Sequence, residues 1–328
     1  MTVSPSTSLP RRVSVIIPTH NRSQLLREAL ASIRAIEGPD LVFEILIGNN
    51  GTDPQTEEVA AEFGALHFKT EVKGSSASRN LGLTHATGEF LAFIDDDDVW
   101  LPESIRPQIA LLDARPEIDV VFAMLKQTGP DLKNHAPPMP EKRPGEGDDL
   151  LRAMLGGYFP QMGTTVARAR TREIDGLFDE VMTYGQDLDW QLRSARRRAA
   201  AFVPVVVLLF RGREATDYGK MNFHRVQYDR NNFLRNAISE WRIWRSPGEF
   251  LRAYTGSISY FYWHFNYLSE LAAKTGDVRL ARDSVPAAFY VFPFRALAHL
   301  VTRPDFRRAL LLMFRSEKDH PKEDHAPD

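Results

Sequence analysis

The sequence contains no cysteine among its 328 residues, which excludes disulfide bridges, a thiol nucleophile and metal sites built on thiolates. It also lacks a hydrophobic run of the roughly 20 residues that a membrane-spanning helix needs. An excess of positive charge is missing as well, because the formal net charge is -2, so the overall charge does not favour a nucleic acid as partner. Residues 1–10 have no apolar segment of the kind found in signal peptides. These absences predict a cytoplasmic protein.

Short apolar segments alternate with segments of helical periodicity up to about residue 210. This alternation is typical of an α/β fold with a mostly parallel sheet. The first helix is expected to start near Asn21, because Asn21 and Gln24 have the spacing of a capping box. Strands are expected at residues 13–18, 43–47, 65–68, 89–94, 118–123 and 201–210. Further helices are expected at residues 53–63, 76–86, 101–113, 148–155 and 187–198.

The remaining segments differ in composition from this core. Residues 129–147 are rich in Pro, Lys and Glu and predict a loop. From Tyr228 onward the pattern is helical, with many aromatic residues. The chain is therefore expected to divide into a flexible N-terminus (1–12), a catalytic domain (13–213), a helical C-terminal region (214–315) and a disordered tail (316–328).

Four consecutive aspartates, Asp95 to Asp98, follow directly on the strand expected at residues 89–94. In open α/β sheets, ligands bind outside the carboxyl ends of the strands. Crowded carboxylates repel one another and need a cation or protons nearby. Their oxygen atoms suit Mg²⁺ or Mn²⁺ bound to a diphosphate. The alternative is a solvated acidic turn, but the position after an apolar strand favours a metal site.

Three segments resemble, in order, the inverting family 2 glycosyltransferases of the GT-A fold. They are VSVIIPTHNR (Val13–Arg22), SRNLGLTHATGEFLAFIDDDDVW (Ser78–Trp100) and GLFDEVMTYGQDLD (Gly176–Asp189). The resemblance implies a Rossmann-like GT-A domain with a nucleotide-binding half (13–123), an acceptor half (124–213) and a helical C-terminal extension. It also implies transfer of a hexosyl group from a nucleoside diphosphate sugar to an acceptor hydroxyl, with inversion.

The resemblance further implies roles for individual residues. Asp97 and Asp95 fall on the metal-binding Asp-x-Asp positions, and Asp187 falls on the position of the base that deprotonates the acceptor. Asp187 could instead only cap its helix, and Asp189 is a rival base. Arg79 suits a phosphate or a base carbonyl, the alternative being a surface arginine. The nucleotide is expected to lie against Pro18, Thr19, His20, Asn49, Arg79, Asp95 and Asp96.

The sequence departs from the family pattern at several positions. Asn49 stands where an Asp usually reads the base, and its amide still suits the uracil or thymine of a UDP- or dTDP-sugar. Gln186 replaces the usual Glu before the base. No His directly follows the last core strand to complete the metal site. The more distant His224 could serve there, or Arg213 could neutralise the phosphate instead. These departures leave open a pseudoenzyme that binds a nucleotide sugar without turnover.

A nucleotidyltransferase is a further alternative, since such enzymes also combine metal-binding carboxylates with an α/β sheet. The Gly-rich, Lys-containing phosphate loop that would support it does not follow the first strand. Trp190, three residues after Asp187, is either a wall of the acceptor site or a core residue.

The C-terminal segments 287–301 and 306–314 are aromatic and basic. Such segments can lie on a membrane surface, which would place the protein at the inner face of the membrane near a lipid-linked acceptor. Packing on the catalytic domain or on a second subunit is the alternative. The acceptor class itself stays open between a glycan, a lipid-linked molecule and a small molecule.

Overall fold

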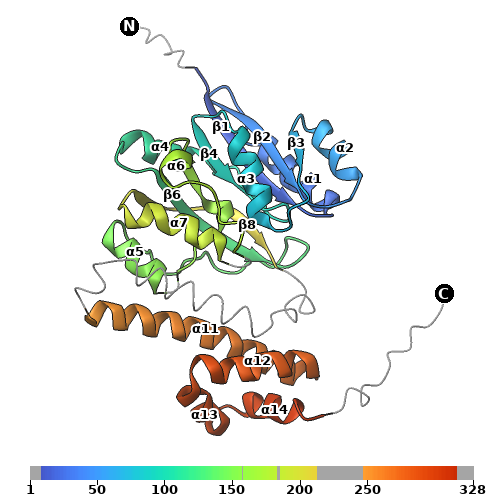
Figure 1. Ribbon diagram of the computed structural model, residues 1–328, viewed down its shortest axis with the longest axis vertical. Helices are drawn as coiled ribbons and strands as arrows, with labels where there is room; N and C mark the ends of the chain where they lie inside the picture. The colour runs from blue at the N-terminus through green and yellow to red at the C-terminus, as the bar shows by residue number, and fades with distance from the viewer. Residues whose placement is uncertain (1–8, 157, 183–184, 213–246, 316–328) are drawn as a thin grey trace, which may run out of the picture. The chain divides into compact units, whose positions relative to one another are not determined.

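The computed structural model describes residues 9–156, 158–182, 185–212 and 247–315 (Figure 1). The chain divides into two compact units, Met1–Arg213 and Glu214–Asp328. Residues 1–8 of the predicted flexible terminus and the predicted tail 316–328 lie outside the described residues, as does the segment 213–246 with Arg213 and His224. The predicted terminus (1–12) is too long, because strand β1 (Arg11–Thr19) already begins within it.

The first unit is built on an eight-stranded sheet in the order β3-β2-β1-β4-β7-β6-β8-β5. Strands β3, β2, β1 and β4 are mutually parallel, and β6 is parallel to β8. Strand β7 lies antiparallel between β4 and β6, and β5 pairs antiparallel with β8. The predicted α/β fold with a mostly parallel sheet is therefore confirmed. The strands are β1 (Arg11–Thr19), β2 (Leu41–Asn49), β3 (Leu66–Lys69), β4 (Phe90–Phe93), β5 (Val99–Trp100), β6 (Val120–Thr128), β7 (Val166–Arg168) and β8 (Ala200–Arg211).

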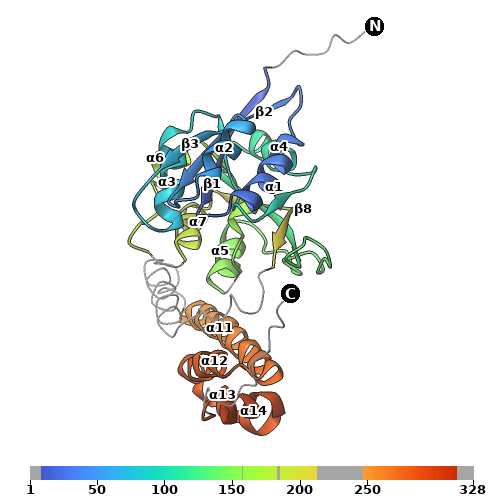
Figure 2. The ribbon, with the colours of Figure 1, turned by 90° about the vertical axis from the view of Figure 1, so that its right-hand side faces the viewer.

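Helices connect these strands and cover both faces of the sheet (Figures 1 and 2). They are α1 (Ser23–Arg34), α2 (Gln55–Glu62), α3 (Ser75–His85), α4 (Arg106–Ala114), α5 (Asp148–Leu155), α6 (Thr171–Ile174) and α7 (Gln186–Arg196), with a 3₁₀ turn at Met162–Thr164. Helix α4 begins later than the predicted residue 101. The backbone N–H of Leu101 donates to the carbonyl of Val207 (2.9 Å), which ties this segment to β8 instead.

The two faces of β1 follow from the alternation of its side chains. Val15 and Ile17 lie in the hydrophobic core together with Leu30 of α1, whereas Ile16 points to the opposite face, where α3 packs. A Cβ on Gly82 of α3 would lie 2.8 Å from Ile16 Cγ2. A Cβ on Gly48 of β2 would lie 1.9 Å from the carbonyl oxygen of Ser78. Glycine at both positions thus allows α3 to lie directly on the sheet.

The predicted capping box at Asn21 is wrong. Asn21 adopts a left-handed conformation (φ 55), and α1 begins at Ser23 without a side-chain cap from Arg22. Asn21 Oδ1 instead accepts hydrogen bonds from the backbone N–H groups of Thr52 (2.7 Å) and Asp53 (2.9 Å). Asp53 Oδ2 in turn accepts from the N–H of Ser23 (3.4 Å). The turns after the neighbouring strands β1 and β2 therefore hold each other.

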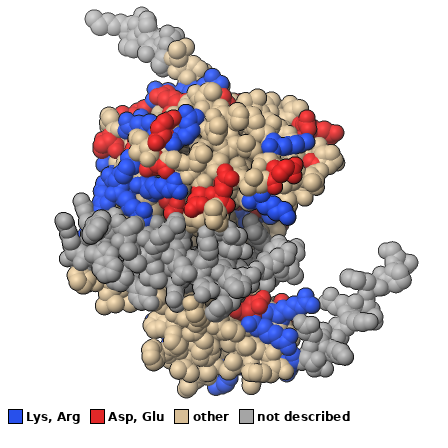
Figure 3. Space-filling model, viewed as in Figure 1, with Lys and Arg blue, Asp and Glu red and all other residues tan. Residues whose placement is uncertain are grey.

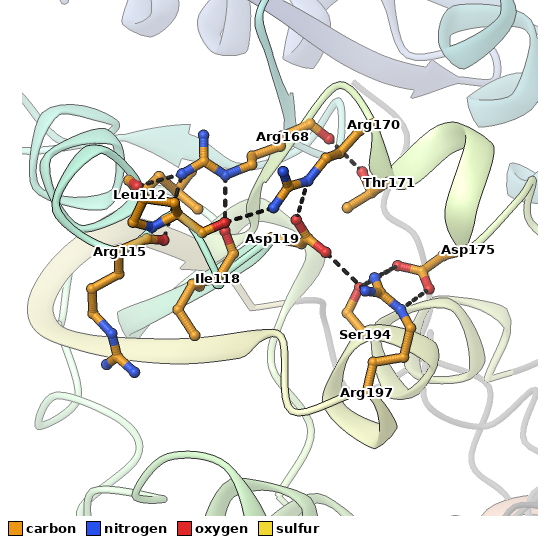
Figure 4. A network of polar contacts seen from close by, with 11 residues as sticks. Leu112, Arg115, Ile118, Asp119, Arg168, Arg170, Thr171, Asp175, Ser194 and Arg197 are labelled. Carbon is orange, nitrogen blue, oxygen red and sulfur yellow. Dashed lines mark hydrogen bonds and ion pairs between the residues drawn. The ribbon is translucent and has the colours of Figure 1, made fainter.

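A network of charged groups around two buried carboxylates, Asp119 and Asp175, joins α7 to the sheet (Figure 4). Arg197 donates to Asp119 Oδ2 (2.8 Å) and, through two nitrogens, to Asp175 (2.9 and 2.7 Å). Asp119 also accepts from Arg170 Nε (2.6 Å), and Asp175 accepts from the hydroxyl of Ser194. Arg197 follows α7 directly, so these contacts fix the end of α7 against the start of β6.

The second unit is helical. Its hydrophobic core contains Tyr262, Phe265 and Phe306. A polar chain runs through it, in which Tyr262 Oη contacts His299 Nδ1 (2.7 Å) and Arg303 donates to Glu270 (2.7 Å). Within the described residues, no helix combines the length and apolar character required to cross a membrane. The helices are α11 (Pro247–Thr275), α12 (Val278–Val291), α13 (Pro293–Thr302) and α14 (Pro304–Leu312).

The network around Arg197 predicts a large effect on stability. Replacing Arg197→Met removes the only cation that contacts both buried carboxylates of Asp119 and Asp175 in the described part of the chain. Removing this cation leaves the buried Asp175 carboxylate without its charged partner, so we expect urea unfolding to show a loss of about 2 kcal/mol.

Arg152→Met is the matched control, because Arg152 pairs with Asp149 on the exposed surface. This variant should change the unfolding free energy by about 0.5 kcal/mol or less. Equal effects of the two substitutions would show that the network does not stabilise the first unit.

Candidate functional site

The carboxyl ends of β1, β2 and β4 lie along one edge of the sheet. Thr19, the last residue of β1, is in register with Asn49, the last residue of β2. Strand β4 ends earlier, at Phe93 opposite Ile16, and the chain continues past it into the acidic run. The structure thus brings the ends of three strands, and the residues predicted from them, to one edge.

The four aspartates alternate between two environments. Asp95 and Asp97 are partly exposed, whereas Asp96 and Asp98 are buried. Only the first pair can therefore reach a ligand in solvent with its carboxylate oxygens, and this is the pair that the sequence predicts as the Asp-x-Asp positions. The buried pair points into the protein and has structural partners there.

Two groups contact the buried carboxylate of Asp96 at this edge of the sheet. Its Oδ2 accepts a hydrogen bond from the hydroxyl of Thr19 (2.7 Å), and its Oδ1 lies 3.2 Å from Arg22 Nη1. Burial raises the pKa of Asp96 to about 6, against the lowering effect of Thr19 and Arg22. Thr19 and Asp96, both predicted to bind the nucleotide, are thus buried and bound to each other, and Pro18 is buried within β1.

Arg22 is a site residue that the sequence interpretation did not assign. Its Nη1 contacts Asp97 Oδ2 (2.9 Å) as well as Asp96 Oδ1. The guanidinium therefore compensates two of the four carboxylates from the turn after β1. The signal available in the sequence was a basic residue in that turn, since the turn and the acidic run follow strands that pair with each other.

Asp98 lies at the other end of the acidic run, against β8. Its Oδ1 accepts from the backbone N–H of Arg211 (2.9 Å), and Arg211 Nε donates to the carbonyl of Asp97 (2.7 Å). Burial raises the pKa of Asp98 well above its usual value. The end of β8 is thus bound directly to the acidic run.

Arg79, predicted to contact the nucleotide, lies at this edge but is not a surface arginine. Its Nη2 donates to Asp95 Oδ1 (2.7 Å), and its guanidinium carbon lies 5.5 Å from the centre of the Phe178 ring. The side chain is only 5% exposed, yet its Nε and Nη1 have no hydrogen-bond partner among the described residues. Buried donors without partners are costly, so Arg79 can hydrogen-bond further to an anionic ligand.

The residue after Arg79 joins the two halves of the unit. Asn80 Nδ2 donates to the carbonyl of Phe178 (2.9 Å) and to Glu180 Oε1 (2.8 Å). Asn80 Oδ1 accepts from the N–H of Phe178 (2.9 Å). Asn80 therefore fixes the segment that precedes α7 against α3.

Asp187, the predicted base, lies in the first turn of α7, after Gly185 in a left-handed conformation (φ 70). It is partly exposed, and its Oδ1 accepts from the N–H of Leu188 (2.9 Å). The neighbouring Gln186 Nε2 donates to Ser75 Oγ at the start of α3 (2.6 Å). Asp187 is thereby brought to the helix that carries Arg79.

Two residues beside Asp187 have structural environments. Asp189, the rival base, is buried and accepts from Arg193 (2.6 Å). Trp190 is fully buried, stacks on Phe178 with ring centres 5.2 Å apart, and donates from Nε1 to the carbonyl of Gly176 (2.9 Å). Of the two alternatives for Trp190, the structure selects the core residue.

Asn49 and His20 lie at the ends of β2 and β1. Asn49 is 1% exposed; its Oδ1 accepts from the N–H of Gly51 (2.7 Å), and its Nδ2 lies 3.1 Å from His67 Nε2. Burial, together with Lys69, lowers the pKa of His67, which favours a neutral ring that accepts from Asn49. His20 is exposed, with Nδ1 3.0 Å from Asn50 Oδ1.

A divalent cation would meet two partly exposed carboxylates at this edge, those of Asp95 and Asp97. Within the described ranges, no group of three or more His, Cys, Asp or Glu side chains converges on a metal position. Mg²⁺ commonly takes one or two carboxylates from a protein and completes its coordination with substrate phosphates and water. The pair therefore fits a cation that is bound together with a diphosphate.

Comparison with known proteins agrees with this geometry. The family model described as glycosyl transferase family 2 matches residues 14–171. An uncharacterized glycosyltransferase of Rickettsia typhi is 27% identical over 212 residues, which cover 62% of this chain and 64% of that protein. Two other Rickettsia relatives are matched over 56% and 39% of their lengths. The chain thus spans less than two thirds of the length of these relatives.

Two solved structures are similar over most of the chain. Staphylococcus aureus TarS, residues 1–349 in complex with UDP-GlcNAc, has a TM-score of 0.61 at 17% identity and covers 92% of this chain and 90% of its own. The mannosyltransferase PcManGT of Pyrobaculum calidifontis, in complex with GDP-Man and Mn²⁺, has a TM-score of 0.51 at 20% identity, with coverages of 95% and 87%. At these identities the likeness concerns the fold, and it confirms the predicted GT-A architecture.

The environment of Asp96 predicts a pH-dependent stability. Burial raises its pKa to about 6, whereas an unfolded Asp titrates near 4. The stability that the protonated form contributes is full below about pH 4 and is lost as the pH rises through about 6. Asp96→Asn removes this titration, so the variant should gain roughly 2–3 kcal/mol relative to wild type between about pH 4 and 7 in urea unfolding.

Asp40→Asn is a control of opposite sign, because the hydrogen bond from Arg106 lowers the pKa of the exposed Asp40. Removing the carboxylate of Asp40 should lower the unfolding free energy relative to wild type as the pH rises. A stability difference between Asp96→Asn and wild type that does not change with pH would contradict the buried environment of Asp96.

Proposed function

We propose that this chain, whose residues 14–171 match the model of glycosyl transferase family 2, transfers a sugar from a nucleoside diphosphate sugar to an acceptor hydroxyl with inversion. The observation that carries the proposal is the hydrogen bond from Gln186 to Ser75 (2.6 Å). It joins the start of α7, which bears Asp187, to the start of α3, which bears Arg79. A proton acceptor and an anion-binding cation therefore belong to one site.

The donor diphosphate lies against Arg79 and the exposed side of the acidic run. The support is the pair of buried Arg79 nitrogens that have no partner in the described part of the chain, since a phosphate oxygen satisfies such donors. The base of the nucleotide lies beside His20 and beside the turn after β2. In that turn, Asn49 Oδ1 accepts a hydrogen bond from the N–H of Gly51. We assign UDP or dTDP as the nucleotide, and the UDP-GlcNAc complex of the TarS structure is consistent with a uridine donor.

Asp97 and Asp95 are the residues that would hold Mg²⁺ or Mn²⁺. When bound, the cation supplies positive charge to the diphosphate as that group departs. Arg79 contributes to the same end, because Asp95 fixes its guanidinium, a planar cation that suits phosphate oxygens. Arg22 holds the carboxylate of Asp97 in place from the other side.

Asp187 acts as the general base in a single displacement. Its carboxylate takes the proton of the acceptor hydroxyl while that oxygen forms a bond to the anomeric carbon. The bond from the anomeric carbon to the diphosphate breaks on the opposite face, and the nucleoside diphosphate leaves with the bonding electron pair. Asp187 is supported over Asp189 by its exposure, since Asp189 is buried and bound to Arg193. The acceptor is a hydroxyl of a glycan, a lipid-linked molecule or a small molecule.

The donor site predicts a loss of nucleotide affinity in Arg79→Ala. Removing a charged hydrogen-bond donor to a phosphate costs about tenfold to 100-fold in affinity. Calorimetric titration with UDP and Mn²⁺ should therefore show a dissociation constant raised by that factor. Arg106→Ala, which removes an exposed arginine paired with Asp40, is the control and should bind as wild type. Unchanged affinity in Arg79→Ala would remove Arg79 from the donor site.

The role of Asp187 as general base predicts a separate effect on turnover. Asp187→Asn keeps an oxygen that accepts from Leu188 but loses the proton acceptor, so the rate should fall by about 10²–10⁴-fold. UDP affinity should stay within about twofold of wild type. Sugar transfer and donor hydrolysis without acceptor are both to be measured, because a wild-type chain that binds UDP and shows neither reaction would be a pseudoenzyme.

Asp189→Asn is the matched control. Since Asp189 is buried beside Arg193, its substitution should lower the melting temperature and leave the rate per folded molecule close to wild type. If Asp189→Asn abolishes turnover while Asp187→Asn retains it, the base is Asp189.

A further inference from the structure

The outward face of α13 carries no charged side chain. Phe294, Leu297 and Val301 lie on it at the spacing of one helical stripe and are 80%, 55% and 79% exposed. The opposite face, with the fully buried Ala296, packs into the core of the helical unit. Helix α13 thus exposes only uncharged and mostly apolar side chains, whereas a surface helix normally turns polar residues outward. The exposed residues of this helix are Pro293, Phe294, Leu297, Ala298, Val301 and Thr302.

Helix α14 extends the apolar surface and adds positive charge. Leu311 and Phe314 are 66% and 80% exposed and follow Arg307 on one stripe, while Arg308 and Arg315 are exposed beside them. Residues 293–315 contain five arginines and one aspartate, and that aspartate, Asp305, is paired with Arg308 (3.2 Å). Figure 3 shows basic residues gathered along one side of the visible face of this unit, most of which is uncharged.

An aromatic side chain of α11 lies beside the two other arginines of residues 293–315, Arg295 and Arg303. The guanidinium carbons of Arg303 and Arg295 lie 4.8 and 5.6 Å from the centre of the Trp263 ring. Trp263 and the neighbouring Tyr267 are both exposed. Tryptophan and tyrosine with adjacent arginines are the residues that favour the boundary between lipid and water.

From this arrangement we propose that α13 and α14 bind the surface of an anionic lipid bilayer. Phe294, Leu297 and Val301 enter the boundary between headgroups and acyl chains, and Arg307 and Arg308 contact the headgroup phosphates. Binding of this kind lies in the plane of the membrane and needs no spanning helix. The proposal stands apart from the donor chemistry, since none of these residues belongs to the candidate site.

Charge decides between a bilayer and a second copy of the chain as the occupant of this surface. In a two-fold symmetric contact the patch would meet itself, so the arginines of one copy would face those of the other with one aspartate from each side. Like charges brought together are destabilising. An anionic lipid surface supplies the missing negative charge, and its acyl region accepts the apolar stripe.

The test is co-sedimentation of the full chain with vesicles of phosphatidylcholine, with and without phosphatidylglycerol. The wild type should bind the vesicles that contain phosphatidylglycerol, and binding should weaken as salt is raised. Phe294→Ser combined with Val301→Ser should reduce partitioning by about 100-fold, since both exposed side chains lose their apolar contact. Arg307→Gln combined with Arg308→Gln should reduce it by about fivefold for each arginine.

Ile174→Ser is the control, because Ile174 is similarly exposed (52%) but lies on α6 of the other unit; it should partition as wild type. Circular dichroism of each variant establishes whether it is folded. If the variant with Phe294→Ser and Val301→Ser does not fold, the variant with Arg307→Gln and Arg308→Gln still tests the proposal. Absence of vesicle binding by the wild type would overturn the proposal. A dimer in sedimentation equilibrium that Phe294→Ser with Val301→Ser converts to a monomer, without lipid binding, would overturn it in favour of a second copy. UDP affinity is measured in parallel, so loss of donor binding and loss of lipid binding remain distinguishable.

Discussion

Four carboxyl groups lie together at the end of β4, and their burial and mutual repulsion are the constraint on which the first unit depends. Three arginines from three different elements compensate it: Arg79 from α3, Arg22 from the turn after β1, and Arg211 from the end of β8. Each arginine is anchored by its own element. The contacts that lower the repulsion therefore also fix the positions of α3, β1 and β8 around the acidic run, and folding of the sheet and assembly of the site become the same event.

The sequence predicts the parts of the fold that have a strong local pattern. The long apolar strands β1, β2 and β8 and the amphipathic helices α1 and α7 fall where their periodicity indicates. Strands β5 and β7, with two and three residues, are too short to show any alternation. Asn21 shows why a local motif can mislead: its capping spacing is real, but the neighbouring turn after β2 offers its side chain closer donors.

The site is predictable where chemistry depends on position in a motif and less so where it depends on distant contacts. The sequence places the acidic run at the end of a strand, and the family resemblance assigns Arg79 to the nucleotide and Asp187 to the acceptor. The sequence does not distinguish exposed from buried aspartates, because that depends on Thr19 and on Arg211, far along the chain. The sequence did not predict Arg22 for the same reason, since its partners Asp96 and Asp97 come close to it only in the folded sheet, where the turn after β1 lies beside the end of β4.

The close approach of α3 to the sheet restricts how the protein can be engineered. Any side chain at Gly48 would collide with the backbone of Ser78, and one at Gly82 would collide with Ile16. Saturation libraries that include these two codons would lose most of their members before selection begins. Libraries intended to change donor preference are better directed at His20 and Asn50, which are exposed and partly exposed at the same edge.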